Sequence, residues 1–219
     1  MAVTASGQVY AWGRNANGQL GRGNTTDAST PVQILSSGGA SVGAGQTHSL
    51  VVKTDGTVWA TGLNGNGQLG NGNTNQQLSL VQMTGVAGAS RAGGGAKFSV
   101  VLLADGTAMA TGYDASGQLG DNNSIQRTTA VAVVGLTGAS AIAVAEDHAL
   151  ARTSSGAVYA WGLNGSGRLE NRAGPGNRRH LRSGDVQRWR GHEAPGRNVG
   201  AMVWHFEGSA EDVGEAVRA

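Results

Sequence analysis

The chain has 219 residues with a charged fraction of 14% and a formal net charge of +2, which gives no strong electrostatic attraction to nucleic acid or to acidic substrates. It contains no cysteine, which excludes disulfides, thiolate zinc sites and a cysteine nucleophile, and no apolar run approaches the length of a membrane span. Its 38 glycines and only 3 prolines are typical of a protein with many tight turns.

A motif of eleven residues occurs four times along the chain. It reads AWGRNANGQLG at 11–21, ATGLNGNGQLG at 60–70, ATGYDASGQLG at 110–120 and AWGLNGSGRLE at 160–170. Its first glycine falls at 13, 62, 112 and 162, so successive copies are 49, 50 and 50 residues apart. A repeat of this length is one supersecondary unit that cannot bury its apolar face alone, so the sequence predicts an array of units.

Each unit is predicted to contain four short strands. In the second unit, the apolar run 50–52 leads to Asp55-Gly56 and then to the run 58–60, and the third unit repeats this order around Asp105-Gly106. An Asp-Gly pair between two apolar runs favours a tight hairpin in which both central residues have positive φ. Further runs around Val32, Val81 and Val131, and around Val42, Ala92 and Ala143, supply the other two strands. The prediction is an all-β chain of four-stranded antiparallel blades that cover one another on both faces.

These segments resemble the repeat of the RCC1 (regulator of chromosome condensation) family. The resemblance rests on G-x-x-H-S at 45–49, D-G-T-V-W-A-T-G at 55–62, N-G-Q-L-G at 66–70 and Thr-Pro-Val at 30–32. It implies a β-propeller, usually of seven blades, in a family that includes an exchange factor for the small GTPase Ran, a β-lactamase inhibitor and many bacterial surface proteins. We therefore expect an RCC1-like propeller fragment of about three and a half blades, whose open edges can pair with another copy.

The repeat array is predicted to occupy residues 1–170, followed by a different segment at 171–219. This Arg-rich tail holds 8 of the 16 basic residues, and the return strand expected after Leu169 is missing from its pattern. Two interpretations remain open. The tail is either a basic linker with a short helix near 207–218, or the product of a shifted reading frame that is mostly disordered.

Some residues invite a more specific function but fit the repeat better. The G-x-G-x-x-G string at 65–70 matches a dinucleotide fingerprint, but no helix is predicted after it, so we interpret it as turn chemistry. His48 and His148 have Phe98 between them at the corresponding position, which indicates a packed ring and not a ligand. We also expect three tryptophans at strand ends to lie in the core: Trp12, Trp59 and Trp161. No catalytic, cofactor-binding or metal-binding residue is predicted, and nucleic-acid binding by the tail is not expected.

The favoured function is a non-catalytic scaffold that presents variable turns to a protein partner. The candidate partner-binding residues lie in the turns on one rim: Arg14, Asn15, Asn64, Asn66, Tyr113, Asp114 and Asn164. The alternative is a carbohydrate-binding or hydrolytic accessory module of a larger extracellular enzyme, which would need paired carboxylates from different turns. Turns rich in Asn, Thr and Ser with few Lys favour a bacterial extracellular or cell-surface location, as part of a longer protein, over a cytoplasmic one.

Overall fold

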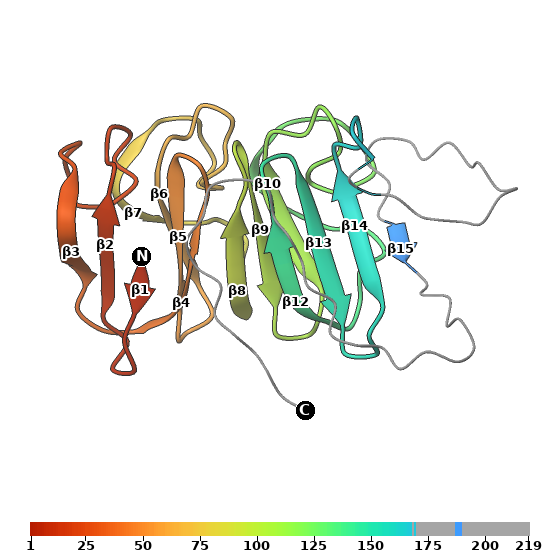
Figure 1. Ribbon diagram of the computed structural model, residues 1–219, viewed down its shortest axis with the longest axis horizontal. Helices are drawn as coiled ribbons and strands as arrows, with labels where there is room; N and C mark the ends of the chain where they lie inside the picture. Colours follow the sequence, from red (N-terminus) through yellow and green to blue (C-terminus); the bar gives the residue numbers. More distant parts are fainter. Residues whose placement is uncertain (168, 170–186, 190–219) are drawn as a thin grey trace, which may run out of the picture.

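The computed structural model describes residues 1–167, 169 and 187–189, and all regular secondary structure within them is β-strand. The strands form four antiparallel sheets, each built from consecutive strands of the chain (Figure 1). The first sheet contains β1 (Ala2–Val3), β2 (Val9–Gly13) and β3 (Ala28–Leu35). The second contains β4 (Gly39–Ala44), β5 (His48–Lys53), β6 (Val58–Gly62) and β7 (Gln77–Gln82). The third contains β8 (Ala89–Gly94), β9 (Phe98–Leu103), β10 (Ala108–Gly112) and β11 (Arg127–Ala132). The fourth contains β12 (Ala139–Val144), β13 (His148–Thr153), β14 (Val158–Gly162) and β15 (Gln187–Trp189). The predicted all-β fold with four-stranded antiparallel blades is confirmed.

The first and fourth sheets differ from the middle two. In the first sheet, β1 has two residues and pairs with β2 through Ala2↔Tyr10 and Val3↔Val9. In the fourth sheet, β15 pairs with β14 as β7 pairs with β6 in the second sheet. The prediction that the segment after Leu169 lacks a return strand is therefore wrong. Hydrogen bonds between neighbouring strands join backbone N–H and C=O groups. The segment 187–189 can therefore complete the sheet although it lacks the side-chain pattern of the repeat. The rest of the predicted tail, 171–186 and 190–219, lies outside the described residues.

The hairpin turns differ in one respect from the prediction. Gly56 has φ +77°, whereas Asp55 does not have positive φ, because Asn122 is the one non-glycine with positive φ in the described part of the chain. The Gly56 amide donates to the Lys53 oxygen at 3.0 Å, and the Thr57 amide donates to Asp55 Oδ1 at 2.9 Å. The connection is therefore a three-residue loop with a left-handed glycine at its end, and not a two-residue turn.

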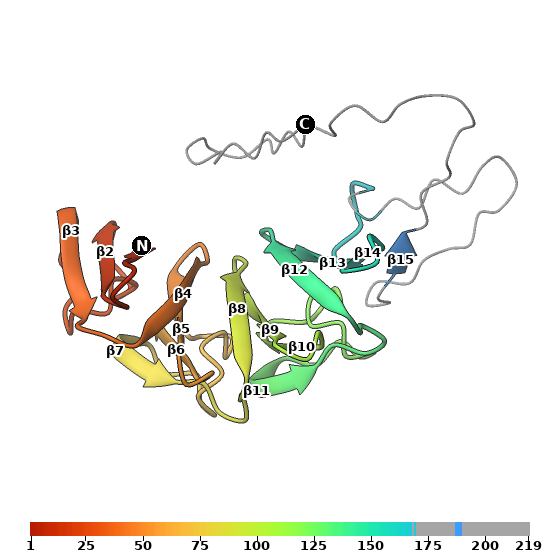
Figure 2. The same cartoon turned by 90° about the horizontal axis from the view of Figure 1, so that it is seen from below.

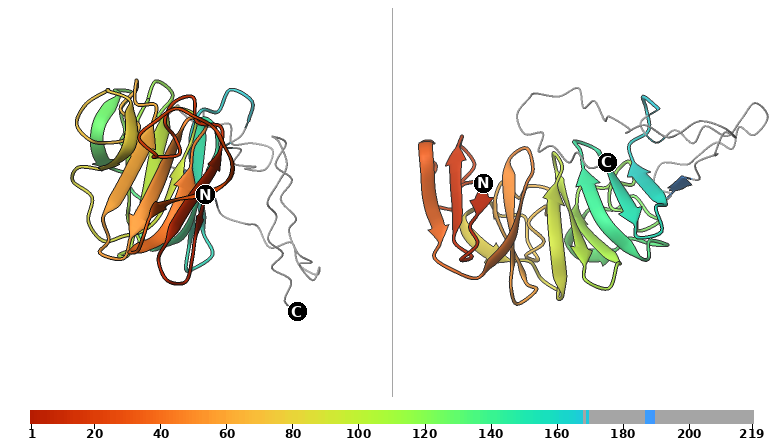
Figure 3. Two further views of the ribbon diagram at one scale, coloured as in Figure 1. Left: turned by 90° about the vertical axis from the view of Figure 1, so that its left-hand side faces the viewer. Right: turned by 60° about the horizontal axis from the view of Figure 1, so that its bottom comes forward.

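The sheets follow a curved path with their innermost strands side by side (Figures 2 and 3). β4 contacts β8, and β8 contacts β12. Here the backbones approach closely: the Gln46 amide donates to the Gly95 oxygen at 3.1 Å, and the Ala96 amide donates to the Glu146 oxygen at 2.8 Å. A Cβ atom on Gly45 would lie 2.6 Å from the Gly95 oxygen, so this joint between sheets requires glycine.

Alternate residues of each middle strand face opposite neighbours, as expected for blades. Between the second and third sheets, Leu50 and Val58 pack in one cluster with Val101 of the third sheet. Between the third and fourth sheets, Val100 packs with Trp161. The middle sheets are thus apolar on both faces, which confirms the blade arrangement.

A buried histidine links the second and third blades. His48 is buried, and its Nε2 lies 2.9 Å from Ser99 Oγ, which itself donates to the Gln68 oxygen at 2.7 Å. Because the serine hydroxyl donates to the Gln68 oxygen, the imidazole donates to Ser99 Oγ through Nε2. Burial lowers the pKa of His48 to about 4, which agrees with a packed ring.

The three strand-end tryptophans do not share one environment. Trp161 is fully buried and donates from Nε1 to the Gln118 oxygen at 3.0 Å. Trp59 is half-buried, with the Lys53 ammonium 3.9 Å from its ring centroid. Trp12 is 43% exposed, so its predicted place in the core is wrong. The physical reason is that Trp12 lies on the face of the first sheet that points away from the second.

Candidate functional site

The long loops of the array gather at one end of the strands. Those that follow β2, β6 and β10 lie at the top of Figure 1, and the hairpin turns between β5 and β6 and between β9 and β10 lie at the bottom. We call residues 14–27, 63–76 and 113–126 the rim loops. Each rim loop leaves one strand of a sheet and returns as the last strand of the same sheet, so its two ends are held by a rigid frame.

A buried asparagine near the start of the rim loop ties it together. Asn64 Oδ1 accepts from the Leu69 amide at 3.0 Å, and Nδ2 donates to the oxygens of Asn73 and Asn75 at 2.9 and 3.1 Å. Asn15 makes the corresponding bonds in the first loop. One amide side chain therefore satisfies three backbone groups that would otherwise be unpaired inside the loop.

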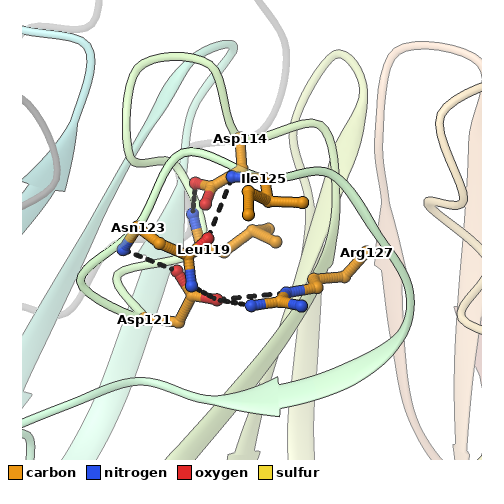
Figure 4. Close-up of polar contacts among 6 residues, drawn as sticks. All are labelled: Asp114, Leu119, Asp121, Asn123, Ile125 and Arg127. Atoms are coloured by element: carbon orange, nitrogen blue, oxygen red, sulfur yellow. Dashed lines mark hydrogen bonds and ion pairs between the residues drawn. The ribbon is translucent and has the colours of Figure 1, made fainter.

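The third rim loop carries a carboxyl group where the other two carry this amide (Figure 4). Asp114 is fully buried, and Oδ1 accepts from the Leu119 amide at 2.8 Å. Oδ2 stands in the position of the amide nitrogen, cannot donate when ionised, and makes no hydrogen bond to any described residue. Burial raises the pKa of Asp114 to about 7, the Asp121 carboxylate adds to this rise, and the Leu119 amide and the Arg127 guanidinium oppose it.

Asp121 is tied by other partners in the same loop. The Arg127 guanidinium lies 3.1 Å from Asp121 Oδ2 and forms an ion pair with it. Asn123 donates to Asp121 from its amide at 3.1 Å and from its side-chain Nδ2 at 2.7 Å. The Ile125 amide in turn donates to Asn123 Oδ1 at 2.9 Å. The polar groups of the third loop thus hold its shape, as the asparagine does in the first two.

The predicted partner-binding residues fall into two groups. The side chains of Asn15, Asn64 and Asp114 are fully buried, so our expectation that they are presented on the rim is wrong. Their polar atoms are used within the loop. Among the others, Arg14 is exposed, and three are half-buried: Asn66, Tyr113 and Asn164. Tyr113 has the Lys97 ammonium 5.5 Å from its ring centroid.

Sequence reasoning missed the most exposed part of the rim, which is the second half of each loop. Exposed residues run through 23–27 and 72–76, and Asn122, Ser124, Ile125 and Gln126 are exposed in the third loop. Ile125 is the most exposed large apolar side chain of the described residues, at 62%. The available signal was the variation between units at these positions: GNTTD, GNTNQ and NNSIQ.

Other kinds of site have little support in the described part of the chain. It holds no group of three or more His, Asp and Glu side chains placed to share a metal ion. Nor does any helix there have the length and apolarity to cross a membrane. The G-x-G-x-x-G string at 65–70 is a turn within the second rim loop, as we predicted.

Comparison with known proteins agrees with the repeat. Models described as "Regulator of chromosome condensation (RCC1) repeat" match residues 6–52, 55–102, 40–68 and 140–168, which together cover more than half of the chain. The ultraviolet-B receptor UVR8 of Arabidopsis thaliana is 45% identical over 58 residues, which are 25% of this chain and 13% of that protein.

Solved structures show the same fold over longer segments. Human WBSCR16 is 25% identical with a TM-score of 0.68, and the match covers 86% of this chain and 50% of that protein. Prp20p of Saccharomyces cerevisiae, reported with its binding properties to Gsp1p and histones, is 20% identical with a TM-score of 0.61, over 77% of this chain and 44% of that protein. The chain therefore spans about half the length of the solved structures that it matches. Its repeats, its four sheets and these matches show that the chain belongs to the RCC1 repeat family and has a β-propeller fold over about three and a half blades.

Proposed function

We propose that the chain is a non-catalytic scaffold that binds a protein partner through the exposed second halves of its rim loops. The observation that carries this proposal is that each loop contains both a buried side chain that fixes its backbone and a run of exposed residues. A buried side chain, Asn64 or Asp114, fixes the loop backbone, while the residues at 72–76 and 122–126 are exposed and differ between units. Variable exposed residues on a rigid frame are the usual arrangement of a binding surface.

The third rim loop offers the best anchor for a partner. Ile125 places an apolar side chain, 62% exposed, beside polar neighbours such as Ser124 and Gln126. A single apolar anchor surrounded by polar groups is typical of the centre of a protein interface, where burial of that side chain contributes much of the affinity. Repeat membership is consistent with this function. The yeast neighbour shows the fold alone, so its partners are not carried over to this chain.

The hydrolytic alternative is weakened by the state of the two carboxyl groups in the third loop. Asp114 is fully buried, so a substrate cannot reach it, and Asp121 is paired with Arg127. A pair of general acid and general base must both contact the substrate. We therefore keep the scaffold as the proposed function. We also retain an extracellular or cell-surface location as a prediction, which protease treatment of intact cells would test.

Site-specific photocrosslinking tests the proposal. A photoreactive residue is placed at Ile125 or Thr74 on the rim, or at Asp55 or Asp105 in the exposed hairpin turns at the opposite end. We expect one defined protein adduct from the rim positions and none from the hairpin positions. Adducts of equal yield from both ends, or from the hairpins alone, would contradict a rim interface.

A further inference from the structure

The third rim loop places an oxygen atom where the other two rim loops have a hydrogen-bond donor. In the second loop, Asn64 Nδ2 lies 2.9 Å from the Asn73 carbonyl oxygen and 3.1 Å from the Asn75 carbonyl oxygen. Asn71 Oδ1 lies 3.0 Å from the same nitrogen. The amide protons make these contacts favourable. In the third loop, Asp114 Oδ2 takes the place of this nitrogen and has no hydrogen-bond partner among the described residues.

The hydrogen bonds that shape the second loop recur in the third. The Ile125 amide donates to Asn123 Oδ1 at 2.9 Å. The corresponding bond in the second loop, from the Asn75 amide to Asn73 Oδ1, is also 2.9 Å long. In both loops, the buried side chain accepts through Oδ1 from the backbone amide five residues later. We therefore expect the carbonyl oxygens of Asn123 and Ile125 to face Asp114 Oδ2.

Asp121 adds a second carboxyl group on the same side of the loop (Figure 4). Its Oδ2 accepts from Arg127 Nε at 3.2 Å, from Arg127 Nη2 at 3.1 Å and from Asn123 Nδ2 at 2.7 Å. Its Oδ1 accepts one hydrogen bond within the described part of the chain, from the Asn123 amide at 3.1 Å. The two oxygens of a carboxylate have about four lone-pair sites, so Oδ1 keeps one for a further ligand.

The charges and the burial of this group favour a cation. When both carboxyl groups are ionised, Asp114 and Asp121 together with Arg127 carry a net charge of −1. Asp114 is fully buried, and a buried oxygen that faces other oxygens is unfavourable unless a proton or a cation lies between them. Above the Asp114 pKa of about 7 the proton is absent, so only a cation can balance these oxygens.

We propose that the third rim loop binds one calcium ion. Its ligands are Asp114 Oδ2, Asp121 Oδ1 and the carbonyl oxygens of Asn123 and Ile125. Calcium prefers such mixtures of carboxylate and carbonyl oxygens, and oxygens that share a Ca²⁺ at about 2.3–2.6 Å lie about 3 Å apart. This spacing matches the contacts around the corresponding amide nitrogen of the second loop. The first two loops cannot form the site, because that nitrogen occupies the position of a ligand oxygen.

This inference goes beyond the rim interface and does not depend on it. Calcium binding is measured on the free chain without a partner, whereas the interface is tested by crosslinking to a partner. A failure of either idea therefore leaves the other standing.

Calcium titration of the purified 219-residue chain at pH 8, after treatment with a chelator, tests the site. Calorimetry should show one ion per chain with a dissociation constant of about 10⁻³ M or tighter. Millimolar CaCl₂ should raise the melting temperature, because the ion binds the folded chain. Asp114→Asn should stay folded and lose both responses, since its amide places a donor where the ion would be bound.

Asp105→Asn is the matched control, because it removes an exposed carboxylate from a hairpin turn at the opposite end of the strands. This variant should bind calcium as the wild type does. Equal calcium responses of wild type and Asp114→Asn, or a wild type without saturable binding at millimolar CaCl₂, would overturn the proposal.

Transfer of the site to the second rim loop tests whether the two carboxyl groups create it. The double variant with Asn64→Asp and Asn71→Asp copies the carboxyl groups of the third loop onto the corresponding positions. It should bind two ions per chain, and calcium should offset the loss of stability caused by the new buried carboxylate. A double variant that gains neither a second ion nor calcium-dependent stability would contradict the proposed ligands.

Competition by protons distinguishes this site from exposed carboxylates. The charged groups that face Asp114 are Asp121 and Arg127, and its pKa of about 7 means that the group is protonated at pH 5. Calcium binding should therefore be weaker at pH 5 than at pH 8 by about tenfold or more. The exposed Asp55 and Asp105 have lowered pKa values, because a threonine in each turn donates to them, and they stay ionised at pH 5. An affinity unchanged between pH 8 and pH 5 would place the ion on such exposed groups and overturn the proposal.

Discussion

Replacing Asp114 with asparagine should stabilise the protein, and the gain should depend on pH. In the second rim loop, the Asn64 amide donates to the oxygens of Asn73 and Asn75. In the third loop, the corresponding Oδ2 of Asp114 is buried and makes no hydrogen bond to any described residue. Asp114→Asn restores the donor that the repeat uses elsewhere and removes a buried negative charge.

The pKa of Asp114 sets the size of this effect and its pH range. Its rise from 3.8 to about 7 corresponds to a loss of about 4 kcal/mol of folding free energy once the group is fully ionised. The pKa of Asp114 is higher in the folded chain than in the unfolded chain. The wild-type protein therefore has its full folding free energy below about pH 4, and it loses the part that depends on Asp114 as the pH rises toward 7. Relaxation of the loop around the charge reduces the cost, so we expect Asp114→Asn to gain about 2 kcal/mol near pH 8. The gain should shrink as the pH is lowered.

Urea unfolding of both proteins across pH 5 to 8 measures this difference directly. The reciprocal variant Asn64→Asp is the matched control, since it places a carboxyl group in the second loop and should destabilise the chain increasingly with rising pH. A difference between wild type and Asp114→Asn that stays constant with pH would refute the role assigned to the Asp114 carboxyl group. So would a variant that is less stable than wild type at pH 8.

Four further substitutions test the joints and turns by thermal or urea unfolding. Gly106→Ala should destabilise more than Gly156→Ala. Both glycines have positive φ, at +81° and +83°, but a Cβ on Gly106 would lie 2.8 Å from the Gly138 Cα, whereas a Cβ on Gly156 meets no atom within 4 Å. We expect about 1 kcal/mol for the Gly156 variant and at least about 2 kcal/mol for the Gly106 variant; equal losses would contradict the close approach. Trp161→Phe should cost about 1 to 3 kcal/mol because it leaves a buried carbonyl oxygen without its donor, and a neutral result would argue against that hydrogen bond. Asn122→Gly should stabilise by up to about 1 kcal/mol, since Asn122 has φ +63°, and destabilisation would contradict this conformation.

The fold was predictable because the same motif recurs at a nearly constant spacing in the sequence. Spacing of 49 and 50 residues, apolar runs and Asp-Gly pairs were enough to predict consecutive antiparallel sheets. Strand β15 was not predictable, because its pairing with β14 uses backbone groups and the segment 187–189 lacks the side-chain pattern of the earlier return strands. The exposure of Trp12 was also missed, since identical V-Y-A-W-G strands differ only in whether a blade lies against them.

The partner-binding site stays a prediction, but three of its seven predicted residues are buried and cannot present their side chains to a partner. Asn15, Asn64 and Asp114 stand in turns and are polar, so composition alone suggests exposure. Their burial depends on hydrogen bonds to residues five to eleven positions later, as between Asn64 and the Leu69 amide or the Asn75 oxygen. Such bonds become visible only once the loop has closed on itself.

An exchange of loop tips tests the scaffold proposal most directly. Residues 72–76 and 122–126 share Asn at their second position and Gln at their fifth, so three changes convert the third tip into the second: Asn122→Gly, Ser124→Thr and Ile125→Asn. Because Asn123 and the frame around Asp114 are untouched, we predict that the melting temperature falls by no more than a few degrees. Crosslinking of the partner through a photoreactive residue at the exposed Lys97, beside this loop, should be lost. Undiminished crosslinking in a folded variant would contradict the claim that the exposed loop tips bind the partner.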